Sequence, residues 1–316
     1  MKPEILQLSP ILIPEIRERL EDLFVIRRYY EQADKAAYVA EHGANIRGVI
    51  TGGHTGISQA LMAQLPQLQV VAVNGVGTDA VDLAYARDRG ITVTATIGAL
   101  TEDVADLAIG LLIGVCRGLC TGDRYVRSGQ WATSATPLVP LPLARQVSGM
   151  RIGIVGMGRV GRAIAVRAAA FGCPIRYTDL QAVDVPYGFE PYLEQLAADS
   201  DALILAAAAD QGTALVDSRV LRALGPQGYL INIARGKLVD EQALVSALQT
   251  GQIAGAALDV FVDEPRVPTE LFEREDIVMQ PHRASATVQT RTRMGEMVVA
   301  SLVDVFAGRE PKGLVA

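Results

Sequence analysis

The sequence is poor in the residues that build metal sites, disulfide frameworks and nucleic-acid surfaces. Its 316 residues include three histidines, three cysteines and one tryptophan, and acidic residues outnumber basic ones by 35 to 29. The net charge of −6 argues against nucleic acid as a partner. Cys116 and Cys120 lie four residues apart on a predicted helix, but no histidine or further cysteine accompanies them. We therefore predict no metal, and we interpret the thiols, Cys173 included, as buried core residues.

Long hydrophobic runs are also missing. The longest, near LAIGLLIGVC, is far too short to span a bilayer, and the opening MKPEILQLSP lacks the apolar core of a signal peptide. These features predict a cytoplasmic protein with no membrane partner. Half of the residues are apolar, and the length is too great for one hydrophobic core, so we expect about two compact domains.

From about residue 43, short β-rich runs alternate with helical patterns. Several of these runs are apolar throughout, as is typical of strands covered by helices on both faces. The alternation predicts an α/β fold with doubly wound parallel sheets. The predicted strands are RGVIT, VVAV, ITVT, RIGIV, IRYT, ALILA, YLINI, AALDV and DIVMQ.

One segment interrupts the alternation. Residues 101 to about 129 form a long helical pattern that begins with Thr101 as N-cap and two acidic residues in its first turn. We expect it to bridge two lobes. The proline-rich stretch SATPLVPLPLARQVSG follows as an irregular arm, and a last helix is expected over about 287–306.

The stretch RIGIVGMGRVGRAIAVRAAAFG has the spacing of a phosphate cradle. Gly156, Gly158 and Gly161 follow a predicted strand and open a predicted helix in the pattern G-x-G-x-x-G. The first glycine permits a tight turn, the second lets a pyrophosphate approach the backbone, and the third packs the helix on the strand. The motif alone is weak evidence, and its position between strand and helix strengthens it.

Asp179 ends the next predicted strand, where an acid is expected to hydrogen-bond the ribose hydroxyls of a dinucleotide. Its charge would repel a 2′-phosphate, and Leu180 supplies no compensating cation. NAD(H) is therefore favoured, and NADP(H) remains possible. The alternative is an ordinary aspartate at a strand end.

Three chemically active side chains follow predicted strands near the carboxyl end of the chain. Arg235 follows YLINI, Glu264 follows AALDV, and His282 follows DIVMQ. If these strands are neighbours, their carboxyl ends bring the three side chains together. An arginine can bind a carboxylate and polarise the adjacent carbonyl, a histidine can deliver a proton to the oxygen that receives a hydride, and a carboxylate can orient the histidine. The set predicts reduction of a 2-oxo acid.

Each of these residues also has an ordinary structural interpretation, as a solvated arginine, a turn acid or a helix cap. His54, in the glycine-rich TGGHTG, remains a rival proton donor.

With these stretches assembled, the chain resembles the D-isomer-specific 2-hydroxyacid dehydrogenases, most closely the glyoxylate, hydroxypyruvate and hydroxyphenylpyruvate reductase branch. The resemblance covers nearly the whole chain. It is carried, in order, by NGVGTDAVDL, LTEDVADLAIGLLIGVCR, DRYVRSGQW, GIVGMGRVGRAIA, LINIARGKLVDEQALVSAL, GAALDVFVDEP and PHRAS.

The resemblance implies a Rossmann-type nucleotide domain, 99–287, inserted into a flavodoxin-like substrate domain, 1–98 and 288–316. It implies Arg235, Glu264 and His282 as the catalytic set. Gly53, Val76 and Gly77 would then contact the substrate carboxylate, and Asp259 would hold the nicotinamide carboxamide. The remaining residues implied near the cofactor are Thr101, Arg159, Val160 and Ala234.

The resemblance further implies a homodimer, with Trp131 as a candidate to enter the partner's site. Two departures from the family pattern concern the cofactor: LAAAADQGT is one residue shorter than usual, and Asp179-Leu180 replaces a frequent Ser-Arg. The expected function is NAD(P)H-dependent reduction of a small 2-oxo acid to the D-2-hydroxy acid. Two alternatives remain open, a dimeric NAD(H)-sensing protein without turnover and a formate- or phosphite-oxidising enzyme.

Overall fold

A computed structural model describes residues 2–133, 141–208 and 214–316. The chain divides into two compact units, Met1–Leu100 with Ser285–Ala316, and Thr101–Ala284. These divisions lie two and three residues from the boundaries expected at 98/99 and 287/288. Each unit contains its own parallel sheet, which confirms the predicted fold class.

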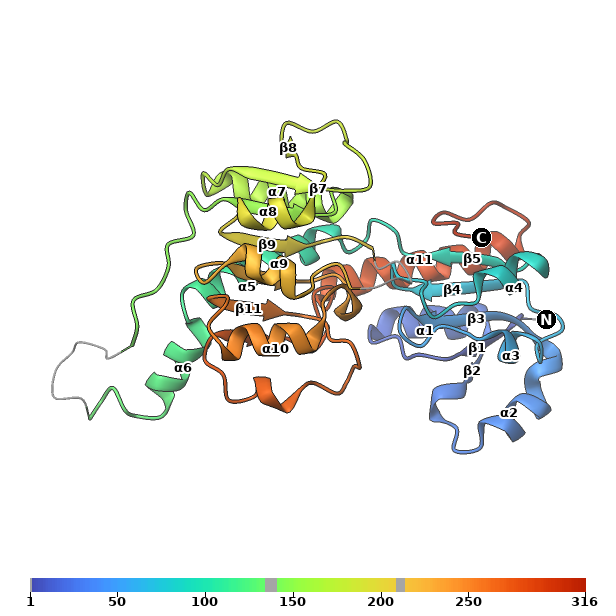
Figure 1. Cartoon of the computed structure of the whole chain (residues 1–316). Coiled ribbons are helices and arrows are strands. Elements are labelled where there is room, and N and C mark those ends of the chain that lie inside the picture. The colour runs from blue at the N-terminus through green and yellow to red at the C-terminus, as the bar shows by residue number, and fades with distance from the viewer. Residues whose placement is uncertain (1, 134–140, 209–213) are drawn as a thin grey trace. The chain divides into compact units, whose positions relative to one another are not determined.

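The first unit is built on five parallel strands. These are β1 (Glu4–Gln7), β2 (Val25–Arg28), β3 (Ile46–Gly52), β4 (Val70–Asn74) and β5 (Thr92–Ala95). Their order, β2-β1-β3-β4-β5, is the doubly wound order of flavodoxin-like sheets (Figure 1). The helices are α1 (Pro14–Leu23), α2 (Lys35–His42), α3 (Gln59–Met62), α4 (Leu83–Asp88) and α11 (Val288–Phe306).

Both faces of this sheet are covered. On one face α1 and α11 pack on Ile5, Ile50 and Val70, and on the other face Leu6 and Val49 belong to a second cluster. Successive strand residues therefore enter opposite cores, which explains why β3 and β4 read as continuous apolar runs.

The second unit is built on seven parallel strands. These are β6 (Ile152–Val155), β7 (Ile175–Thr178), β8 (Gly188–Phe189), β9 (Ala202–Leu205), β10 (Tyr229–Asn232), β11 (Gly255–Leu258) and β12 (Ile277–Met279). Their order is β12-β11-β10-β9-β6-β7-β8, so the strand order reverses between β6 and β9. In open α/β sheets of this kind, ligands bind at the carboxyl ends beside that reversal.

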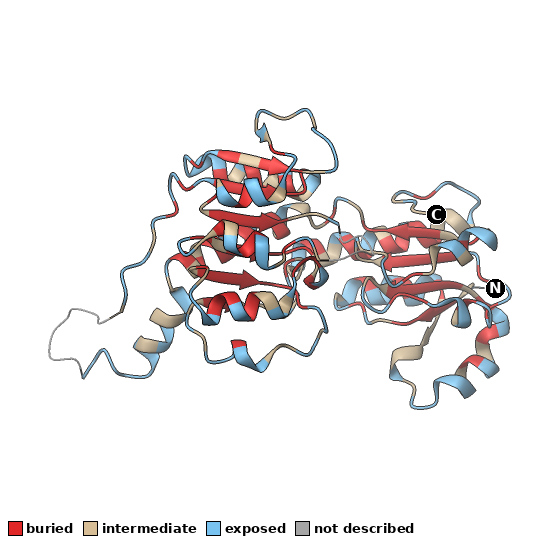
Figure 2. Cartoon of the chain, viewed as in Figure 1, coloured by how far each residue is buried: buried red, intermediate tan, exposed pale blue. Residues whose placement is uncertain are grey.

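The described residues of this unit form six α-helices. They are α5 (Thr101–Cys116), α6 (Leu119–Arg127), α7 (Arg159–Ala170), α8 (Leu193–Ala198), α9 (Ser218–Leu224) and α10 (Glu241–Gln249). They cover the sheet, and Figure 2 shows its strands as largely buried. The sheet is therefore fixed on both faces, and the loops at its carboxyl ends are positioned by it.

The prediction of one long helix over 101–129 is wrong. The chain bends by 63° between α5 and α6, where Gly118 adopts φ +58°. No single helix among the described residues is long and apolar enough to cross a membrane, and α5 and α6 pass that test only as a bent pair.

The bend also separates two of the cysteines. Cys116 is buried at the end of α5, whereas Cys120 in α6 is exposed, so the prediction of a buried thiol is wrong for Cys120. Burial raises the pKa of the Cys116 thiol to about 12 and also raises the pKa of Cys173. These two thiols remain protonated at neutral pH.

Three strands were not predicted. β1 and β2 contain polar and charged residues, and β8 has two residues at the edge of its sheet. Parts of the predicted arm (134–140) and of LAAAADQGT (209–213) lie outside the described residues.

Candidate active site

The glycine turn between β6 and α7 is tightly packed at its first and third glycines and open at its second. Gly156 has φ +93°, and a Cβ there would meet the backbone of Ala207 at 2.6 Å. A Cβ on Gly161 would meet the carbonyl oxygen of Gly156 at 2.0 Å. A Cβ on Gly158 would meet no atom within 4 Å, although Gly158 caps the N-terminus of α7 and is exposed. The open space beside Gly158 fits a pyrophosphate at the helix N-terminus.

Asp179 lies directly after β7 and is bonded to this turn. Its Oδ2 accepts the N–H of Met157 at 2.7 Å, and its Oδ1 accepts the N–H of Leu180 at 2.7 Å. Arg176, two residues earlier, pairs instead with Glu190 and Asp199. The carboxylate thus stays beside the glycine turn, where a ribose would lie when a pyrophosphate occupies the turn.

Other predicted cofactor residues border the same sheet. Arg159 and Val160 open α7, and Thr101 opens α5. Ala234 follows β10 and is buried, and its N–H donates to Oδ1 of Asn232 at 3.0 Å.

Arg235 is presented by a turn that Asn232 holds together. Nδ2 of Asn232 donates to the carbonyl of Arg235 at 2.9 Å, and Nη1 of Arg235 donates to the carbonyl of Ala234 at 2.8 Å. Asn232 is 1% exposed. Sequence reasoning missed this residue, and the signal available for it was an amide at the end of an otherwise apolar strand, YLIN.

The next turn packs against that one. A Cβ on Gly236 would meet the carbonyl carbon of Phe261 at 1.9 Å, so the two backbones are in contact. The N–H of Phe261 donates to Oε1 of Glu264 at 2.9 Å. The Glu264 carboxylate is therefore fixed relative to the turn that carries Arg235.

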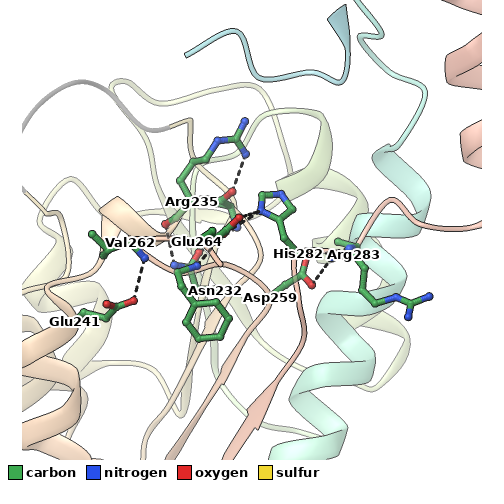
Figure 3. Close-up of polar contacts among 11 residues, drawn as sticks. Asn232, Arg235, Glu241, Asp259, Val262, Glu264, His282 and Arg283 are labelled. Carbon is green, nitrogen blue, oxygen red and sulfur yellow. Dashed lines mark hydrogen bonds and ion pairs between the residues drawn. The ribbon is translucent and has the colours of Figure 1, made fainter. Parts of the chain in front are cut away.

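Glu264 contacts His282 directly. Nδ1 of His282 lies 2.9 Å from Oε2 and 3.0 Å from Oε1 of Glu264, and Figure 3 shows the two side chains pointing toward one another. An ionised carboxylate accepts a hydrogen from Nδ1, which leaves Nε2 of the ring to exchange a proton with a substrate. This is the arrangement of a proton donor and the group that orients it.

The three predicted catalytic residues thus follow β10, β11 and β12, which are neighbouring strands. Arg235, Glu264 and His282 leave the same edge of the sheet. Asp259, at the end of β11, is 1% exposed, and its oxygens accept backbone N–H groups of Arg283 and Ala284.

The predicted substrate contacts in the first unit follow β3 and β4. A Cβ on Gly53 would meet the carbonyl oxygen of Gly77 at 2.9 Å, so their two loops are packed together. Val76 is 40% exposed on the second loop. A small anion can approach backbone amides in such glycine-containing loops.

Comparison with known proteins agrees with these observations. Residues 109–284 match the family described as D-isomer specific 2-hydroxyacid dehydrogenase, NAD binding domain. Glyoxylate/hydroxypyruvate reductase A of Arabidopsis thaliana is 44% identical over 296 residues, 93% of each chain. The 2-ketogluconate reductase of Gluconobacter oxydans is 43% identical and covers 98% of this chain and 97% of its own.

A solved structure also matches over the whole chain. The NADPH-dependent glyoxylate/hydroxypyruvate reductase of Sinorhizobium meliloti, in complex with NADP and malonate, has a TM-score of 0.90 and 41% identity. The match covers 100% of this chain and 97% of the solved chain. The fold and the site define a nicotinamide-dependent oxidoreductase. The chain belongs to the D-isomer-specific 2-hydroxyacid dehydrogenase family, and it is similar over nearly its whole length to members of the glyoxylate/hydroxypyruvate reductase branch.

Proposed function

We propose that this protein reduces a small 2-oxo acid of the glyoxylate and hydroxypyruvate type to the D-2-hydroxy acid, with NADH as the favoured reductant. The observation that carries this proposal is the Glu264–His282 pair beside the turn of Arg235, in the same sheet as an open glycine turn. Residues 99–287 would bind the dinucleotide, and residues 1–98 and 288–316 would bind the substrate.

The glycine turn fits a dinucleotide. The space beside Gly158 and the N-terminus of α7 suit a pyrophosphate, and the Asp179 carboxylate suits the neighbouring ribose. When bound, the reduced nicotinamide would supply a hydride to the oxo carbon. Ala234, Thr101, Arg159 and Val160 are the further residues that we propose for this group. Asp259, which the resemblance implies there, is 1% exposed, and its two carboxylate oxygens accept backbone N–H groups of Arg283 and Ala284.

The catalytic side chains then have separate tasks. The planar guanidinium of Arg235 binds the substrate carboxylate and polarises the oxo group. Protonated His282 delivers the Nε2 proton to the oxygen of that group, and Glu264 holds the ring in orientation through Nδ1. In the oxidative direction His282 takes the proton back. We also propose that backbone amides of Val76 and Gly77, with Gly53 beside them, contact the substrate carboxylate.

The NADH preference is argued from charge. A 2′-phosphate beside Asp179 would place like charges together, and Leu180 is fully exposed without offering a cation. The NADPH-dependent relative shows that this branch also uses the phosphorylated cofactor.

We propose a homodimer in which α6 takes part. Three large apolar side chains of α6 and its continuation are exposed in the single chain: Leu119 (55%), Val126 (54%) and Trp131 (47%). Apolar side chains exposed together on one short segment are typical of a surface that a second copy covers.

The function is tested by following NADH absorbance with glyoxylate, hydroxypyruvate, pyruvate, phenylpyruvate and 2-ketogluconate. We expect the highest kcat/KM with glyoxylate or hydroxypyruvate, and a D product from hydroxypyruvate by chiral chromatography. Turnover confined to 2-ketogluconate would refute the substrate class. An absence of turnover with all five, together with tight NADH binding, would favour the sensing protein.

A further inference from the structure

His282 has an unusual backbone conformation. Among the described residues it is the one non-glycine residue with positive φ, at 49°. Residues of L configuration disfavour this region because Cβ approaches the neighbouring carbonyl oxygen, and they occupy it where surrounding interactions hold them. Something in the structure must therefore hold the backbone of the residue that carries the imidazole.

Asp259 supplies that restraint with three acceptors. Its carbonyl oxygen accepts the N–H of His282 at 2.8 Å, its Oδ1 accepts the N–H of Arg283 at 2.8 Å, and its Oδ2 accepts the N–H of Ala284 at 2.9 Å. Figure 3 shows Asp259 between His282 and Arg283. Three consecutive N–H groups thus bond to one residue. Both sides of the His282 backbone are fixed to the end of β11.

Asp259 is itself anchored. Its N–H donates to the carbonyl of Asn232 at 2.9 Å, and Asn232 also holds the turn of Arg235. One chain of hydrogen bonds therefore connects the backbone of Arg235 with that of His282.

The chemistry of the Asp259 side chain suits this task. Burial raises the pKa of its carboxyl group, and the N–H groups of Arg283 and Ala284 oppose that shift. A buried carboxylate without hydrogen-bond donors would be costly, so its two N–H bonds stabilise it and fix the backbone together. An asparagine of the same size would turn its NH2 group toward one of these donors and lose that bond.

We propose that Asp259 is a positioning residue for His282: it holds the 282–284 backbone so that the imidazole meets Glu264 on one nitrogen and the substrate on the other. This role rests on the proposed function of His282 as proton donor. It is separate from the contact with the nicotinamide carboxamide that the family resemblance implies for Asp259.

The first test is Asp259→Asn. We expect kcat to fall by about 100-fold or more, because the imidazole loses its orientation. The Kd for NADH, measured by fluorescence titration, should stay within about threefold. A weakening of NADH binding as large as the loss of kcat/KM would overturn the proposal in favour of the cofactor contact. An unchanged kcat together with an unchanged Kd for NADH would refute both roles.

Asp201→Asn is the matched control. Asp201 also accepts a backbone N–H, that of Arg151, and pairs with Arg145 and Arg151 at the amino-terminal end of β9. We expect it to lower the melting temperature and to leave kcat within twofold. A 100-fold loss of kcat in this variant as well would show that the effect of Asp259→Asn is general destabilisation.

The rarity of histidine permits a direct spectroscopic test. Histidine-selective 15N labelling gives three imidazoles, and the signals of His282 are assigned by their loss in His282→Gln. Asp259→Asn should shift or broaden the His282 ring signals and leave those of His42 in place. Unchanged His282 signals would contradict the proposal, and this readout does not depend on turnover or on the identity of the substrate.

If Asp259→Asn does not fold, the restraint is tested at His282 itself. A backbone held at positive φ should make His282→Gly melt about 2–4 °C above His282→Ala, since glycine adopts this conformation without strain. Equal melting temperatures would show that residue 282 relaxes to negative φ, which would overturn the restraint.

Discussion

At the scale of single residues, the reactive groups are separated from the groups that hold them. Arg235, Glu264 and His282 are placed to contact a substrate or its proton, whereas Asn232 and Asp259 bond to the backbone that carries them. When a holding residue is substituted, the reactive side chain is still present, but it is no longer held in the orientation that the reaction needs. Substitution of a reactive residue is therefore expected to lower kcat more than substitution of a holding residue. Neither is expected to change the affinity for the cofactor.

Cofactor choice also depends on single residues. We predict that the double variant Asp179→Ser, Leu180→Arg raises the ratio of kcat/KM for NADPH to that for NADH by about 10-fold or more. The change removes a repelling carboxylate and adds a cation for the 2′-phosphate, and one charged contact is worth about 1.5–3 kcal/mol. The ratio is measured with one 2-oxo acid at saturation. A ratio that stays at the wild-type value would show that Asp179 does not face the ribose.

The reactive residues were predictable because parallel strands end at a common edge. Arg235, Glu264 and His282 each follow a recognisable apolar strand, so their convergence follows from strand order alone. The positive φ of His282 and the three bonds to Asp259 were not predictable, because they depend on how the backbone turns after β12.

At the scale of elements, nine strands were predicted because helices cover both of their faces. β1 (EILQ) and β2 (VIRR) were not predicted, because their charged residues interrupt the apolar pattern. β1 pairs with β2 on one side and with β3 on the other. The bend between α5 and α6 was not predicted, because the sequence there contains no proline and an isolated glycine is tolerated within a helix. Between the two helices, Gly118 adopts the left-handed conformation, which interrupts the helical backbone.

A pair of glycines tests that explanation. Gly118 has φ +58° and Gly110 is exposed within α5, and a Cβ on either would meet nothing within 4 Å. We predict that Gly118→Ala lowers the free energy of unfolding by about 1 kcal/mol, because alanine disfavours positive φ. Gly110→Ala should raise it by about 0.5–1 kcal/mol, because alanine favours the helix. Urea titration measures both, and a stabilising Gly118→Ala would indicate one continuous helix.

At the scale of the whole molecule, assembly is the remaining expectation. We predict that light scattering after size exclusion gives twice the mass of one chain, and that Val126→Glu on α6 gives a single chain, because it places a charge in an apolar interface. Val166→Glu is the matched control: Val166 is 65% exposed on α7, and this variant should remain dimeric. A monomeric wild-type protein at micromolar concentration would contradict the homodimer. The cytoplasmic location stays a prediction.

The central claim is that His282 exchanges the proton of the 2-oxo acid reduction, and His282→Ala tests it most directly. With the preferred 2-oxo acid at saturation, we predict that kcat falls by about 1000-fold while the Kd for NADH changes less than threefold. His42→Ala should behave as wild type. The account would be contradicted if His282→Ala kept the wild-type kcat and His54→Ala lost about 1000-fold instead. That result would assign the role of proton donor to His54.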